Sequence, residues 1–83
     1  MMVARDLTKL SDEKLATEVY DLIKDEYAKV YLKVIKMGDL NGSARAINTQ
    51  WLYVRNNLTS WRGEVARMYK KEIDRRIAIG RNA

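Results

Sequence analysis

The side chains that could carry chemistry in this chain of 83 residues are carboxylates, lysines, tyrosines and arginines. His and Cys are both absent, which removes the commonest acid–base catalyst and metal ligand, thiolate zinc sites and disulfides. Asp21 and Asp25 lie four residues apart, as a catalytic pair would, but with lysines nearby a salt-bridged surface is the commoner explanation. No Gly-Lys-Ser/Thr follows Gly38 or Gly42, so a phosphate loop is absent. We therefore expect a protein that is not an enzyme and uses no metal or cofactor.

The positive charge of the chain is concentrated in its C-terminal half. Residues 1–40 contain seven Lys or Arg against eight Asp or Glu, whereas residues 41–83 contain nine against three. Seven of those nine cations are Arg, whose planar fork of donors fits phosphates and guanine edges better than Lys does. The composition thus assigns a polyanion-binding face to the C-terminal half. A solvated helix face in a moderately basic protein is the alternative.

Residues 38–58 predict two short helices that meet at a tight corner. The first covers residues 40–47 and the second residues 50–61, with Asn48 at the corner because Asn tolerates left-handed backbone better than other residues with side chains. A small residue is followed at fixed spacing by three aliphatic residues, which is the layout of a helix-turn-helix: Ala44, Ile47, Val54 and Leu58.

These positions, together with Gly38-Asp39 and Asn48, resemble the Fis-type helix-turn-helix, and small phage regulators and the DNA-binding ends of small terminase subunits are similar. The chain departs from that pattern at three positions: Asn48 replaces the turn glycine, Thr49 an aliphatic residue, and Asn57 a frequently apolar one. The resemblance implies sequence-specific binding of double-stranded DNA by a small transcriptional regulator or a phage DNA-recognition protein.

In such a motif the start and outer side of the second helix face the major groove. We expect Arg55 to pair with guanine and Gln50 or Asn56 with adenine, while Arg45 and Arg62 clamp phosphates. Trp51 has two alternative places, either buried against the first helix or exposed for a partner. The predicted DNA-binding residues are Gln50, Trp51, Leu52, Arg55, Asn56, Thr59, Arg45 and Arg62.

The flanking segments predict an all-α single domain over residues 1–83, built from a long, a short and a second long helix. Residues 1–9 have little pattern and predict a flexible arm. Ser11 is a helix cap followed by two acids, and an apolar stripe from there predicts a long helix over residues 11–37 that Gly38 ends. A second stripe continues the last helix over residues 62–79, with a bend at Gly63.

The small size of the chain predicts self-association. A monomer of this length buries only about 60% of its unfolded-chain surface, and two wide apolar stripes exceed what one copy covers, so we expect a homodimer. No apolar run reaches the roughly 18 residues that span a bilayer, and no signal peptide is evident. We expect a cytoplasmic protein without a membrane segment.

Two alternative functions remain open. Leu10-Ser11-Asp12-Glu13-Lys14-Leu15 and Val65-Ala66-Arg67-Met68 resemble the start and the Ile-Ala-Arg-Ile signature of a small two-helix protein of the large ribosomal subunit, which would bind ribosomal RNA. That likeness leaves residues 49–61 unexplained. Alternatively, the chain is a helical interaction module or inhibitor whose Arg surface meets an acidic protein, and exposure of Trp51 and Leu52 would favour that function.

Overall fold

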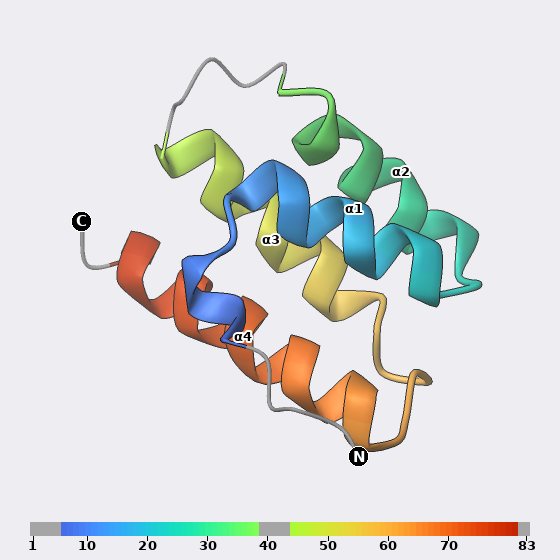
Figure 1. Ribbon diagram of the computed structural model, residues 1–83. Coiled ribbons are helices and arrows are strands. Elements are labelled where there is room, and N and C mark those ends of the chain that lie inside the picture. The colour runs from blue at the N-terminus through green and yellow to red at the C-terminus, as the bar shows by residue number, and fades with distance from the viewer. Residues whose placement is uncertain (1–5, 39–43, 82–83) are drawn as a thin grey trace.

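In the residues that the structure describes, the regular elements are four α-helices and one short 3-10 turn (Figure 1). The computed structural model describes residues 6–38 and 44–81, and within these ranges every regular element is helical, which confirms the all-α prediction. Helix α1 packs on α2, α2 on α3 and α3 on α4, while η1 lies against α4. The elements are η1 (Leu7–Lys9), α1 (Asp12–Leu22), α2 (Glu26–Lys36), α3 (Ala44–Asn56) and α4 (Glu64–Arg81).

Residues 6–9 form a capped 3-10 turn. The Asp6 carboxylate accepts a hydrogen bond from the Thr8 amide at 3.1 Å and caps η1, and Leu7 is only 6% exposed. The predicted flexible arm over residues 1–9 is therefore wrong for residues 6–9, whereas residues 1–5 lie outside the described residues. The start of α1 is as predicted, since Ser11 Oγ accepts from the Lys14 amide at 3.1 Å.

A single long helix over residues 11–37 is not formed, because the chain breaks between α1 and α2. Ile23 has extended backbone at φ −103° and ψ 164°, and the Asp25 carboxylate accepts from the Ala28 amide at 2.9 Å to cap α2. The break lets both helices bury their own apolar faces while Leu22 and Tyr27 remain exposed. The predicted helix end at Gly38 is confirmed by its φ of +70°.

The predicted corner at Asn48 is also wrong, because α3 continues without interruption through this residue. The two predicted helices over 40–47 and 50–61 are replaced by one, and residues 40–43 lie outside the described residues. Asn48 Nδ2 instead donates to the Ile77 carbonyl of α4 at 2.8 Å. One continuous apolar face explains the single helix: Ile47, Trp51, Val54 and Leu58 follow at steps of four, three and four residues.

The chain turns between α3 and α4 instead of running on as one helix. Residues 57–63 form the connection, and Gly63 immediately before α4 has a φ of +113° that disfavours side chains. The predicted bend at Gly63 is thus a separation of two helices. Helix α4 also extends to Arg81, beyond the predicted end at residue 79.

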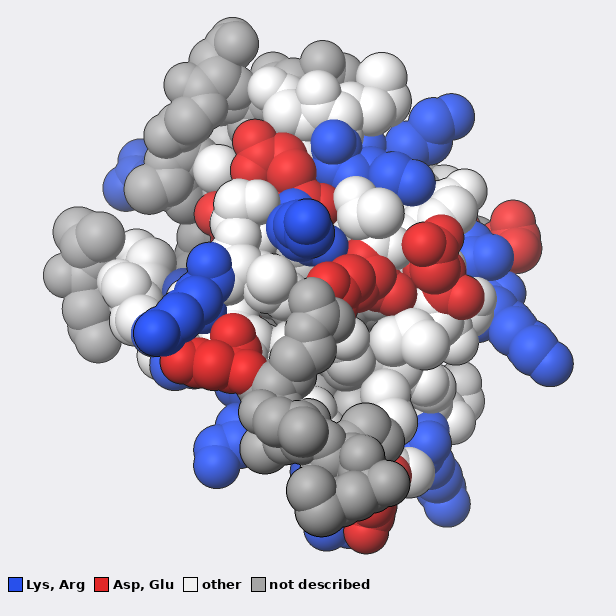
Figure 2. Space-filling model, viewed as in Figure 1, with Lys and Arg blue, Asp and Glu red and all other residues white. Residues whose placement is uncertain are grey.

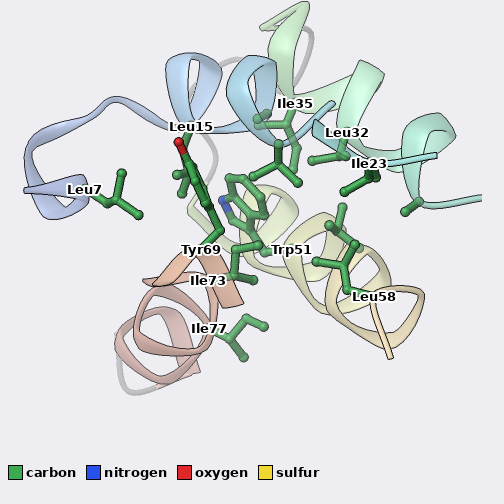
Figure 3. Close-up of a cluster of buried hydrophobic side chains, with 14 residues drawn as sticks. Leu7, Leu15, Ile23, Leu32, Ile35, Trp51, Leu58, Tyr69, Ile73 and Ile77 are labelled. Atoms are coloured by element: carbon green, nitrogen blue, oxygen red, sulfur yellow. The ribbon is translucent and has the colours of Figure 1, made fainter. Parts of the chain in front are cut away.

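Trp51 lies at the centre of the core, between α1 and α2 on one side and α4 on the other (Figure 3). Its side chain is 1% exposed, and its Nε1 donates to Asp12 Oδ1 of α1 at 2.9 Å. The other large side chains that are fully buried surround it: Leu15, Val19, Leu32, Val54, Leu58 and Ile73. In the described part of the chain, no helix is both long and apolar enough to cross a bilayer.

Candidate functional site

A groove of about 550 Å³ lies between the C-terminal end of α3 and the first half of α4. Trp61, Gly63 and Ala66 form part of its wall. The charged residues that line it are five cations and one carboxylate, which we call the basic groove: Arg55, Arg62, Arg67, Lys70, Lys71 and Asp74. This grouping is notable because other cations of the molecule lie among acids, as on the face over α1 and α4 in Figure 2.

Helix α4 places the cations of the groove by its amphipathic pattern. Residues 66, 69, 73 and 77 face the core and are buried. Arg67, Lys70, Lys71 and Asp74 also share one side of the helix, which lies about a quarter turn around α4 from the buried face. Because the buried face fixes the rotation of α4, it also fixes which charges line the groove.

The charges of the groove are only partly compensated. Arg55 Nε donates to Asp74 Oδ1 at 2.9 Å, in a pair whose side chains are 30% and 54% exposed. Partial burial, followed by the nearby positive charges of Arg55 and Arg62, lowers the pKa of Lys70, while Asp74 acts in the opposite direction. An anion bound beside Lys70 would relieve this repulsion.

The start of α4 adds to the positive potential. Gly63 lines the groove directly before the helix and has no side chain to cap the first amides. These amides and the helix dipole favour negative charge at this end. The groove therefore combines cationic side chains with backbone donors at the start of a helix.

Two other arginines of the C-terminal half have a structural role. Glu72 is 5% exposed and accepts hydrogen bonds from Arg75 and Arg76, the shortest being 2.6 Å from Arg76 Nε. Arg76 also donates to Asp12 Oδ1 at 2.9 Å and to the carbonyls of Leu7 and Leu10. These bonds hold the N-terminal segment on α4. Hydrogen bonds from Arg75 and Arg76 keep the pKa of Glu72 below its ordinary value although burial raises it.

One of the predicted DNA-binding residues, Trp51, faces the protein interior, and its neighbours Gln50 and Leu52 are partly buried on either side of it. Trp51 takes the buried one of its two alternative places and cannot contact DNA. Leu52 is half-buried against the core, and Gln50 Oε1 is buried without a hydrogen-bond partner among the described residues. The reason is the continuous α3, which turns this part of the helix toward α1 and α4 instead of toward a groove of DNA.

The remaining predicted residues lie at two separate places. Arg55 and Arg62 line the basic groove, and Asn56 and Thr59 are exposed nearby in the chain. Arg45 is exposed ten residues before Arg55, which corresponds to about 15 Å along the helix axis. Arg45 does not line the groove.

The sequence analysis did not single out Arg67, Lys70 and Lys71 as site residues. Their signal was that residues 67, 70, 71 and 74 share one side of a helix, directly beside the apolar face of residues 66, 69, 73 and 77. It could have been found by reading α4 as a helix of its own that starts after Gly63.

The described ranges contain no group of three or more Asp, Glu, His or Cys side chains placed to hold a metal ion. Comparison with known proteins adds no assignment of family or fold relative. No family model matches the chain, and neither a curated protein nor a solved structure is significantly similar to it.

Proposed function

We propose that this protein binds nucleic acid, with DNA as the candidate polymer, by holding the phosphate backbone in the basic groove. The observation that carries the proposal is the grouping of five cations around one groove with a single carboxylate among them. Contacts between Lys or Arg and phosphates release counterions and supply most of the affinity of nonspecific binding. Arginine forks also fit phosphate oxygens in pairs.

The proposed mode recognises the backbone and does not depend on base edges read by α3. Trp51 is buried and Gln50 and Leu52 are partly buried beside it, so the direct readout expected from the helix-turn-helix has no support from their positions. A role as a small transcriptional regulator or phage DNA-recognition protein is compatible with backbone binding. Ribosomal RNA and an acidic protein remain the competing partners, since RNA has the same phosphates and carboxylates also pair with Arg.

The homodimer is a second part of the proposal, with a surface separate from the groove. Tyr27, Val30 and Met37 on the outer side of α2 are 74%, 60% and 60% exposed, which is unusual for apolar side chains that follow each other on one helix face. We propose that a second copy covers them. Sedimentation at micromolar concentration should give a dimer for the wild type and a monomer for Tyr27→Glu, whereas a monomeric wild type would contradict this part.

The groove is tested by comparing two exposed arginines, Arg45 near the start of α3 and Arg62 in the connection before α4. Fluorescence anisotropy with a labelled DNA oligonucleotide at low salt should give weaker binding for Arg62→Ala and wild-type binding for Arg45→Ala, because only Arg62 lines the groove. Equal losses in both variants would favour the helix-turn-helix arrangement, in which both residues clamp phosphates. Competition with a ribosomal RNA fragment and with polyglutamate separates the three partners, and stronger competition by polyglutamate than by DNA would refute the proposal.

A further inference from the structure

Trp61 is shared by the basic groove and by a second pocket on the other side of it. This pocket lies between the loop that joins α1 to α2 and the loop that joins α3 to α4, and we call it the loop pocket. Its volume is about 250 Å³. Sites that enclose drug-sized ligands take roughly 300–1,000 Å³, so the loop pocket is of a size for a single heterocycle.

The lining of the loop pocket combines apolar walls with a polar rim. Leu22, Ile23 and Leu58 form the apolar part together with Trp61, and polar groups are contributed by Asp25, Asn57 and Ser60. A nucleobase has the same division, with two apolar faces and an edge of donors and acceptors.

Contacts with the neighbouring helices hold the walls of the pocket in place. The Trp61 ring packs against Tyr69 at a centroid distance of 6.0 Å, and the Tyr69 hydroxyl donates to Glu18 Oε1 at 2.6 Å. On the rim, Asn57 Nδ2 donates to the Tyr53 carbonyl at 2.9 Å. Trp61 is therefore a half-buried aromatic wall supported by α4 and α1, with cations on one side and an apolar pocket on the other.

We propose that the loop pocket takes an unpaired nucleobase, stacked on Trp61, from a strand whose phosphates lie in the basic groove. The ligand is then single-stranded nucleic acid, because the bases of an intact duplex are paired and must be turned out of the stack to reach such a pocket. A cationic groove beside an aromatic platform is the general means of binding single strands. This inference rests on the proposed function and specifies the form of its ligand.

The test uses three labelled DNA probes of equal length: a single strand, a single strand with abasic units throughout, and a duplex. The wild type should bind the single strand about 5- to 150-fold more tightly than the abasic strand, which is the range for one stacked base. Trp61→Leu should abolish this difference and leave binding of the abasic strand intact. Trp61→Tyr should keep most of it, and Tyr53→Leu, which changes an exposed aromatic residue outside both pockets and outside the proposed dimer surface, should have no effect.

A second variant tests the loop pocket without changing Trp61, in case Trp61→Leu does not fold. Ser60→Leu fills the loop pocket from an exposed position without changing charge or removing the contact between Trp61 and Tyr69. It should lower affinity for the single strand to that for the abasic strand. Equal affinity of the wild type for these two probes would overturn the inference and leave backbone binding in place, whereas no binding of any probe would overturn both.

Discussion

At the residue scale, Asn48 near the start of α3 lies directly against Gly80 near the end of α4. Asn48 Nδ2 donates to the Ile77 carbonyl at 2.8 Å, and a Cβ built on Gly80 would lie 2.5 Å from the same nitrogen. Any side chain at residue 80 must therefore displace Asn48 from its hydrogen bond. The glycine is needed here for space between helices.

Because of this contact, the effect of Gly80→Ala on the free energy of unfolding should depend on which residue occupies position 48. Gly80→Ala should lower the free energy of unfolding in the wild type, but should be neutral or stabilising with Asn48→Ala, because Ala has the higher helix propensity and no longer meets a side chain. Urea denaturation should give a coupling energy of about 1 kcal/mol. If the two substitutions changed the free energy of unfolding additively, the contact between residues 48 and 80 would be contradicted.

The stability of the Asn48→Gly variant distinguishes a continuous α3 from the predicted corner at residue 48. In the structure it removes a hydrogen bond and places Gly inside α3, so we expect a loss of about 1–2 kcal/mol in the free energy of unfolding. A left-handed corner at this residue would make the same substitution neutral or slightly stabilising. Thermal or urea unfolding of this variant against the wild type distinguishes the two.

Glu72 is expected to make stability sensitive to acid. Its pKa in the folded protein is held below the ordinary value of 4.5, first by the Arg75 hydrogen bond. Between the folded and unfolded pKa values the unfolded chain binds more protons, so this stabilisation is complete above about pH 4.5 and is lost as pH falls through the folded pKa. Glu72→Gln should destabilise the protein by about 1–3 kcal/mol at neutral pH and reduce the loss on acidification.

The exposed Glu64 supplies the control for this effect. Glu64→Gln should leave the acid dependence of stability close to that of the wild type. Urea denaturation from pH 3 to pH 7 measures both variants, and identical pH profiles for Glu72→Gln and the wild type would contradict the assigned role of Glu72.

At the scale of helices, the break between α1 and α2 depends on Asp25 as a cap. Asp25→Ala should cost about 0.5–2 kcal/mol in the free energy of unfolding, whereas Asp25→Asn should cost little because Asn caps equally well. If the carboxylate acted only through surface charge, both variants would lose the same amount. Urea denaturation of the two variants side by side decides between these roles.

The helix boundaries could be predicted where a local side chain decides them and not where packing decides. Ser11 begins α1 by capping its first amides, and Gly38 ends α2 with a left-handed backbone. Both signals are visible in the sequence. Asp25 followed by Glu26 resembles the Ser11 start, but the broad stripe across residues 15–35 concealed it. The stripe was misleading because Leu22, Tyr27 and Val30 within it are exposed.

The helix-turn-helix prediction failed for a related physical reason. Ala44, Ile47, Val54 and Leu58 are spaced as that motif requires, but the same residues with Trp51 added form one uninterrupted face. The sequence alone does not say whether Trp51 faces inward. Its burial between α1 and α4 favours the continuous helix.

At the scale of the whole molecule, composition could locate the basic half but not the basic face. Arg76 lies at 12% exposure in a network with Glu72 and Asp12, so part of the positive charge of this half is used to hold the fold. The sequence analysis named only Arg55 and Arg62 among the cations of the groove. The others depend on where α4 begins and on its rotation, which is set by the packing of its buried face, mainly against α3.

The salt dependence of binding tests the basic groove most directly. Each phosphate neutralised on a single strand contributes about 0.7 to the slope of log affinity against log salt, so four uncompensated cations predict a slope of about −3 for the wild type. Arg62→Ala should make the slope less steep by about 0.7, and Arg45→Ala should leave it unchanged. A slope that Arg62→Ala does not alter, or that both substitutions reduce equally, would contradict binding in the basic groove.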